Sequence, residues 1–143
     1  SYSYNDSRYG DFLVVTKNSS NQLVKSNLKN KKVENAPETI FRGGLTVAFK
    51  GIALTGQVSY VGDAFSDANN TVKPTANAQN GVIPSYAVTD LTVSYKFERF
   101  NIKGGINNLT DAHYFTRRAG GYPGPGALPA DGRTFFISLG AKL

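Results

Sequence analysis

The sequence predicts an all-β fold in which six strands form an antiparallel meander. Apolar and polar residues alternate with a period of two in segment after segment, as in strands whose two faces meet different surroundings, and the helical period is hard to find. The connections between these segments alternate between long polar stretches and tight turns. A length of 143 residues suits one domain.

Four segments carry the alternation without interruption. It is clearest in residues 41–50, where Phe41 and Phe49 share one face and Arg42 and Lys50 share the other. The same pattern recurs in residues 52–60, 87–97 and 134–143. Each of these segments is therefore predicted to be a strand with one apolar and one polar face.

Two further strands complete the predicted meander. Residues 1–4 already alternate at the start of the chain, and residues 101–116 begin in phase but slip at Asn108-Leu109. A bulge or bend at that point would explain the slip.

The connections determine the topology. Lys50-Gly51 and Glu98-Arg99 read as tight turns, whereas the stretches near 13–36, 66–84 and 117–132 are long and polar. In a meander this order places every long loop at one end and every tight turn at the other. Transmembrane β-barrels show the same asymmetry, with short periplasmic turns and longer extracellular loops.

The tight-turn end is also marked by charge and by aromatic residues. Phe49, Tyr95 and Phe97 lie in the apolar phase there, where an aromatic girdle meets the membrane interface. The polar phase at the same end carries four lysines, which would form a basic collar at one rim: Lys50, Lys96, Lys103 and Lys142.

Two arrangements fit the alternation. The apolar faces point outward to lipid in a membrane barrel, or inward in a soluble or surface-attached barrel or sandwich that binds a ligand. Strands of about ten residues and loops of unequal length favour the membrane. Six strands are too few to close such a barrel, and the chain begins without Met inside a strand, so we expect it to be the C-terminal part of a larger one.

Composition excludes several classes of chemistry. Because the chain has no Cys, it has neither disulfides nor thiolate metal sites, and His113 as its single His excludes a multi-histidine metal site. A hydrolase using His113 and Asp111 is a remote alternative, and no catalytic residue is predicted. The net charge of +6 favours anionic partners, but the basic residues are split between a loop and the opposite rim, which argues against nucleic acid.

Several motifs occur in the order found in a known family. Residues 105–115, with Asn107-Asn108-Leu109-Thr110-Asp111 and then Tyr114-Phe115, resemble the penultimate-strand motif of TonB-dependent outer-membrane receptors. The later motifs resemble the last extracellular loop of the ferric dicitrate branch of that family: residues 116–126 and 129–133. Earlier matches are residues 36–39, 60–62, 83–86 and Asp90.

The resemblance implies the last six strands of a barrel of about 22 strands whose plug and earlier strands are absent from residues 1–143. It implies an outer-membrane receptor importing a ferric chelate, ferric citrate or a related siderophore, with no cofactor, since iron arrives within the ligand. The implied partners are outer-membrane lipid, the TonB complex acting through the absent plug, and the barrel-assembly machinery. That machinery would read the C-terminal strand ending at Leu143, where the family usually has Phe or Trp.

The candidate ligand contacts lie in the last long loop. Arg117 and Arg118 are the best of them, because guanidinium groups bind carboxylates bidentately and a citrate complex of iron presents several. Tyr122 is a candidate for packing over the ligand or over the rim, and His113 is a candidate whose alternative is a structural or surface role. The alternative for the arginines is loop solvation or pairing with lipopolysaccharide phosphates.

Overall fold

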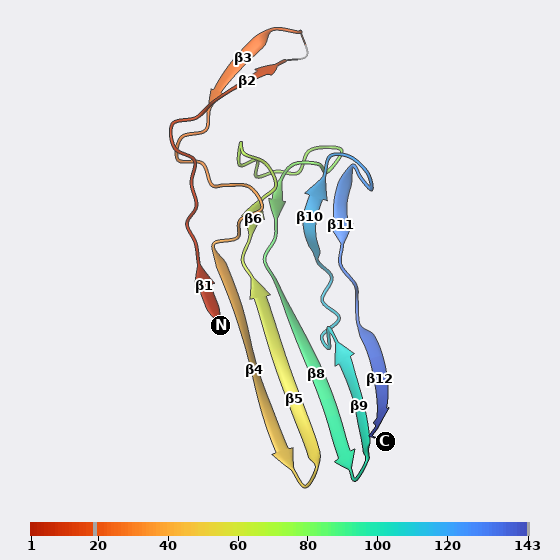
Figure 1. Ribbon diagram of the computed structural model, residues 1–143. Helices are drawn as coiled ribbons and strands as arrows, with labels where there is room; N and C mark the ends of the chain where they lie inside the picture. Colours follow the sequence, from red (N-terminus) through yellow and green to blue (C-terminus); the bar gives the residue numbers. More distant parts are fainter. Residues whose placement is uncertain (19, 143) are drawn as a thin grey trace.

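The main sheet of the computed structural model, which describes residues 1–18 and 20–142, has six antiparallel strands in the order β1-β4-β5-β8-β9-β12 (Figure 1). Apart from short hairpins in the loops, neighbours in the sheet are neighbours in the chain, which confirms the all-β antiparallel meander. The strands are β1 (Tyr2–Tyr4), β4 (Thr39–Phe49), β5 (Ile52–Val61), β8 (Tyr86–Phe97), β9 (Phe100–Asn107) and β12 (Thr134–Ala141).

Both predicted tight turns are confirmed as two-residue connections. Phe49 pairs with Ile52 around Lys50-Gly51, and Phe97 pairs with Phe100 around Glu98-Arg99. Lys50 and Gly51 both have positive φ, 47° and 85°. Such turns twist in the same sense as the strands they join, so they continue the sheet without splaying it.

The apolar phase of the strands forms one exposed face. The register aligns the apolar positions of adjacent strands, and Leu45 and Ile137 are 72% and 76% exposed. The expectation of a soluble barrel with this face packed inward is therefore wrong. Among the described residues, the buried apolar side chains all lie in loops: Leu28, Ala64 and Ile83.

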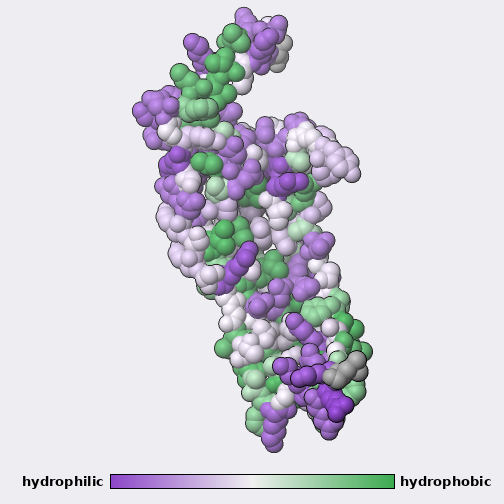
Figure 2. Space-filling view, viewed as in Figure 1, coloured by the Kyte–Doolittle hydropathy of each residue, from purple (hydrophilic) through white to green (hydrophobic). Residues whose placement is uncertain are grey.

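The surface follows this division. In Figure 2 hydrophobic surface borders the lower part of the sheet, while hydrophilic surface gathers at the lowest edge, where the tight turns lie, and over much of the loop end. The register places Lys103 beside Ser94 and Lys96 beside Asn101, in the polar phase near that edge. Over the described residues, none of the segments is a helix long and apolar enough to cross a membrane.

Three long loops leave the other end of the sheet, as predicted, and contain short hairpins that the sequence did not reveal (Figure 1). We call residues 5–38 the first loop, 62–85 the second loop and 108–133 the third loop. Their hairpins are β2 (Leu13–Lys17) with β3 (Leu23–Asn27), β6 (Ala64–Phe65) with β7 (Val82–Ile83), and β10 (Phe115–Ala119) with β11 (Gly126–Pro129).

The predicted strand over residues 101–116 is corrected. β9 ends at Asn107, and Asn108 adopts a φ of 52°, which turns the chain out of the strand. The slip predicted at Asn108-Leu109 is therefore a bend that separates β9 from β10. Leu143, expected to end the last strand, lies outside the described residues.

Candidate ligand-binding site

Asn108 fixes the start of the third loop. It is the one buried polar residue in the described part of the chain, 3% exposed. Its side-chain amide donates to the carbonyl of Ala112 at 2.9 Å and accepts from the N–H of Ala112 at 2.8 Å. Its own backbone N–H donates to Asp90 at 2.9 Å. Asp111 next to it accepts from the N–H of Arg133 at 2.9 Å. A short polar network thus joins the two ends of the third loop to each other and attaches the Asn108 end to β8.

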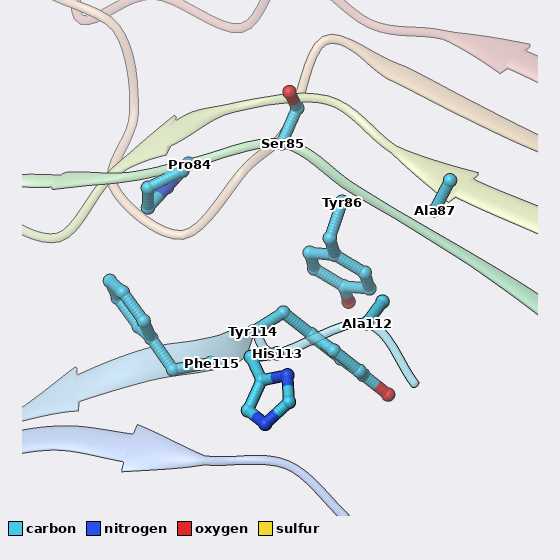
Figure 3. A pocket seen from close by; sticks show the side chains of 8 residues that line it. All are labelled: Pro84, Ser85, Tyr86, Ala87, Ala112, His113, Tyr114 and Phe115. Atoms are coloured by element: carbon cyan, nitrogen blue, oxygen red, sulfur yellow. The ribbon is translucent and has the colours of Figure 1, made fainter. Parts of the chain in front are cut away.

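Tyr86 and Tyr114 stack on each other. Their ring centroids are 4.3 Å apart with an interplanar angle of 22°. Tyr86 is the first residue of β8 and belongs to the polar phase of that strand, because Ala87 is in the apolar phase. The two rings line a small cavity of about 250 Å³ with Pro84 and His113 (Figure 3).

His113 has no catalytic setting. Its ring lies on the side of its segment away from Tyr86 and is exposed (Figure 3). Asp111, the carboxylate considered as its partner, receives the Arg133 N–H. Among residues 1–18 and 20–142, no cluster of three or more acidic, His or Cys residues could hold a metal ion.

Arg117 and Tyr122 line a larger hollow. It has a volume of about 570 Å³ and is bordered by residues 116–119, by Tyr122 and by Asn35 of the first loop. Arg117 is exposed and Tyr122 is fully exposed, so both side chains are available to a ligand. A guanidinium beside a phenol ring is suited to a ligand that carries carboxylates or other oxyanions.

Arg118 is placed differently from Arg117. It is half-buried, and its guanidinium donates to the carbonyl of Val82 from Nε at 3.3 Å and from Nη2 at 3.0 Å, and to the carbonyl of Ala78 from Nη1 at 3.0 Å. Its Cζ lies 4.8 Å from the centroid of the Phe115 ring, a cation–π arrangement. The donors of Arg118 are thus directed at the second loop.

Charged pairs stabilise the base of the first loop. Arg8 lies 2.8 Å from Asp6, and Lys32 lies 2.7 Å from Glu38. The hydrogen bond from Arg8 lowers the pKa of the Asp6 carboxyl, and the hydrogen bond to Glu38 raises the pKa of Lys32. These residues are exposed or half-buried, so solvent screens each pair.

A second polar contact lies nearby in the first loop. The hydroxyl of Tyr9 donates to the carboxylate of Glu34, and this bond raises the pKa of Tyr9 above its ordinary value. Both residues are half-buried. The contact joins the two sides of the first loop below the β2–β3 hairpin.

The structure brings together only part of the predicted site. Arg117, Arg118 and Tyr122 all border the larger hollow, but the Arg118 guanidinium is bonded to the second loop, and His113 lines the smaller cavity instead. Sequence reasoning missed Asn35 and the Tyr86–Tyr114 stack. Both tyrosines lie within motifs that were noticed, but the pattern gave no sign that residues 28 positions apart would stack.

Comparison with protein families decides the family. The family model described as TonB dependent receptor-like, beta-barrel matches residues 1–109. The chain belongs to this family. TonB-dependent receptors are outer-membrane transporters and not enzymes, which confirms the predicted location and makes the hydrolase alternative wrong. Comparison with curated proteins gives no match.

Solved structures show the same fold. The chain is similar to the ferric citrate transporter FecA in its unliganded form, with 21% identity and a TM-score of 0.73 over 82% of this chain and 19% of that one. It is similar to the siderophore receptor PiuA from Acinetobacter baumannii, with 20% identity and a TM-score of 0.67 over 87% of this chain and 16% of that receptor.

A third match is the ferripyoverdine receptor of the outer membrane of Pseudomonas aeruginosa, with 20% identity and a TM-score of 0.61 over 82% of this chain and 16% of that receptor. The chain thus spans less than a fifth of each of these TonB-dependent receptors. At these identities the likeness establishes the meander as part of such a barrel.

Proposed function

We propose that the chain forms the last six strands of a TonB-dependent receptor barrel that imports a ferric chelate, either ferric citrate or a related siderophore. Its family and the iron-chelate receptors among its structural neighbours support this proposal. In the proposed receptor an N-terminal plug, outside residues 1–143, couples the barrel to TonB.

The two edges of the sheet support a larger barrel. β1 pairs with β4 and β12 pairs with β9, and within the described residues neither has a partner on its other side. Hydrocarbon does not tolerate open sheet edges, because their N–H and C=O groups would remain unpaired. We therefore propose further strands that complete the barrel on both sides.

The observation that carries the ligand proposal is the hollow bordered by Arg117, Tyr122 and Asn35 at the long-loop end. This end is opposite the tight turns, so in the proposed orientation it faces the outside of the cell. An exposed guanidinium there favours an anionic chelate over a neutral or cationic one. Arg117 and Tyr122 are the proposed ligand contacts, while His113 and Arg118 are not.

The test is ligand binding by the full receptor. We expect Arg117→Ala to raise the Kd for ferric citrate about tenfold or more, because a charge-assisted bidentate contact contributes roughly 1.5–3 kcal/mol. Arg99→Ala, which removes the same charge in the tight turn at the opposite end, is the control and should leave the Kd unchanged. Equal effects of both variants, or none, would refute the site, and tighter binding of another ferric chelate would reassign the ligand.

A further inference from the structure

The hollow that holds Arg117 has two walls that do not bond to each other. One wall is Asn35 of the first loop, and the other is formed by residues 116–119 and Tyr122 of the third loop. Across the part of the chain that the structure describes, no hydrogen bond or ion pair joins the first loop to the third. The second loop has hydrogen bonds to both of them.

One joint connects the first loop to the second. The side-chain amide of Asn70 accepts from the N–H of Lys32 at 2.7 Å and donates to the carbonyl of the same residue at 2.8 Å. The ammonium of Lys31 donates to the carbonyl of Asn69 at 2.7 Å. Close by, the N–H of Asn35 donates to the carbonyl of Phe65 at 2.7 Å, so the wall residue is itself attached to the second loop.

The other joint connects the second loop to the third. It consists of the three bonds from the Arg118 guanidinium to the carbonyls of Ala78 and Val82, together with a bond from Gln79 Nε2 to the carbonyl of Gly120 at 3.0 Å. Gly81 lies beside this joint with a φ of 136°: a Cβ added there would clash with Cα of Pro74 at 2.9 Å and would only touch Nε of Arg118, at 3.5 Å. Strand β10 of the third loop also contacts β7 of the second.

We propose that Asn70 and Arg118 are positioning residues that hold the two walls of the hollow at one separation through the second loop. Each uses a planar group to bond two or more backbone atoms, which fixes both distance and direction. Arg117 then binds the ligand, whereas Arg118 holds the third loop in position, although the two residues are adjacent in the sequence. The effect of these residues on ligand binding rests on the proposed function, whereas their effect on the spacing of the loops does not.

The first measurement needs no ligand. Cysteine is absent from residues 1–143, and the exposed Gly10 and Gly121 have no atom within 4 Å of an added Cβ, so Gly10→Cys and Gly121→Cys accept spin labels on the two outer loops. In the full receptor with any other cysteine replaced, the label-to-label distance distribution should be narrow. Asn70→Ala and Arg118→Ala should each broaden it, and Arg117→Ala should not.

The two positioning residues, Asn70 and Arg118, also predict which variants should broaden the distance distribution. Arg118→Lys should resemble Arg118→Ala, because an ammonium cannot reproduce three bonds aimed at two carbonyls. A distribution that stays narrow in both Asn70→Ala and Arg118→Ala, in receptor that still inserts into the membrane, overturns the proposal. The two substitutions lie in different loops, so a folding failure of one leaves the other to decide.

The second measurement is the Kd for ferric citrate. Arg118→Ala and Asn70→Ala should each raise this Kd roughly fivefold or more, as expected when a positioning residue is coupled to a binding site. If Asn70→Ala and Arg118→Ala broaden the distances but leave the Kd unchanged, while Arg117→Ala weakens binding, the two positioning residues have no role in binding. If they broaden the distances and Arg117→Ala has no effect on the Kd, their positioning role holds and the proposed function is refuted instead.

Discussion

The Phe136 ring lies over Gly105 of the neighbouring strand, where a Cβ would come within 2.5 Å of Cε1 of Phe136 and 2.9 Å of the carbonyl oxygen of Leu91. An aromatic ring thus covers the backbone that the glycine exposes on the polar face. Lys103 adds a cation–π contact at 5.8 Å from the ring centroid. Glycine at this position is required by the close approach of the ring.

Gly105→Ala should therefore destabilise the barrel by about 1–3 kcal/mol, the usual cost of inserting a methyl group into occupied space. Gly56→Ala is the matched control, because nothing lies within 4 Å of its added Cβ. Thermal unfolding of the full receptor in detergent is the measurement. An equal loss of unfolding temperature in both variants would contradict the steric explanation.

Leu45→Arg tests the direction of the apolar face. Leu45 lies in the middle of β4 and is 72% exposed, so an arginine there meets hydrocarbon and should cost about 2–4 kcal/mol. Leu13→Arg in the first loop is the control, since Leu13 is 61% exposed but lies in the β2–β3 hairpin, outside the six-stranded sheet. Both variants are compared by insertion yield and unfolding temperature. A Leu45 variant as stable as the Leu13 variant would mean that this face does not contact lipid.

Asn108→Ala should disorder the start of the third loop. The substitution leaves the N–H and the carbonyl of Ala112 without their partner, and unsatisfied buried groups cost about 1–3 kcal/mol. Asn107→Ala, which removes one exposed bond to Thr134, should have a much smaller effect. Hydrogen exchange over residues 108–115 measures the difference, and similar protection in both variants would exclude the proposed anchoring.

Acid should loosen the first loop through Asp6. Its pKa is lowered in the folded state by the hydrogen bond from Arg8, so the folded state favours the ionised form. The resulting stabilisation is present above the ordinary value of 3.8 and is lost as the pH falls through the lowered folded pKa. The mobility of a spin label at Gly10→Cys should therefore rise below pH 3.8, and Asp6→Asn should reduce that rise. The same acid response in Asp6→Asn would assign it to another group.

The sequence predicted the sheet far better than the loops, for a physical reason. In membrane-spanning strands apolar and polar residues alternate, and the strands that hold Leu45, Val58 and Leu91 each show this alternation within their own sequence. The strands, their faces and their turns could therefore be predicted segment by segment. The loop hairpins are short and lie among Asn, Ser and Lys residues, which conceal their alternation. β2 has only five residues.

The candidate site was only partly predictable because its contacts join distant parts of the chain. Arg117 and Tyr122 were predicted from their chemistry and from the resemblance of their loop to that of the family, and both border one hollow in the structure. The different role of Arg118 depends on carbonyls 36 and 40 residues away, which no local pattern reveals. Asn35 was missed for the same reason, since it borders the hollow from another loop.

Among residues 1–18 and 20–142, the buried apolar side chains Leu28, Ala64 and Ile83 all belong to loops, and this location affects how the sequence can diverge. On the outer face of the strands a side chain needs only to dissolve in acyl chains, so one aliphatic residue can replace another without disturbing a neighbour. The backbone ladder, which no side chain interrupts, preserves the shape. Exchanges between aliphatic residues on that face should therefore leave the fold unchanged, which is consistent with a TM-score of 0.73 at 21% identity.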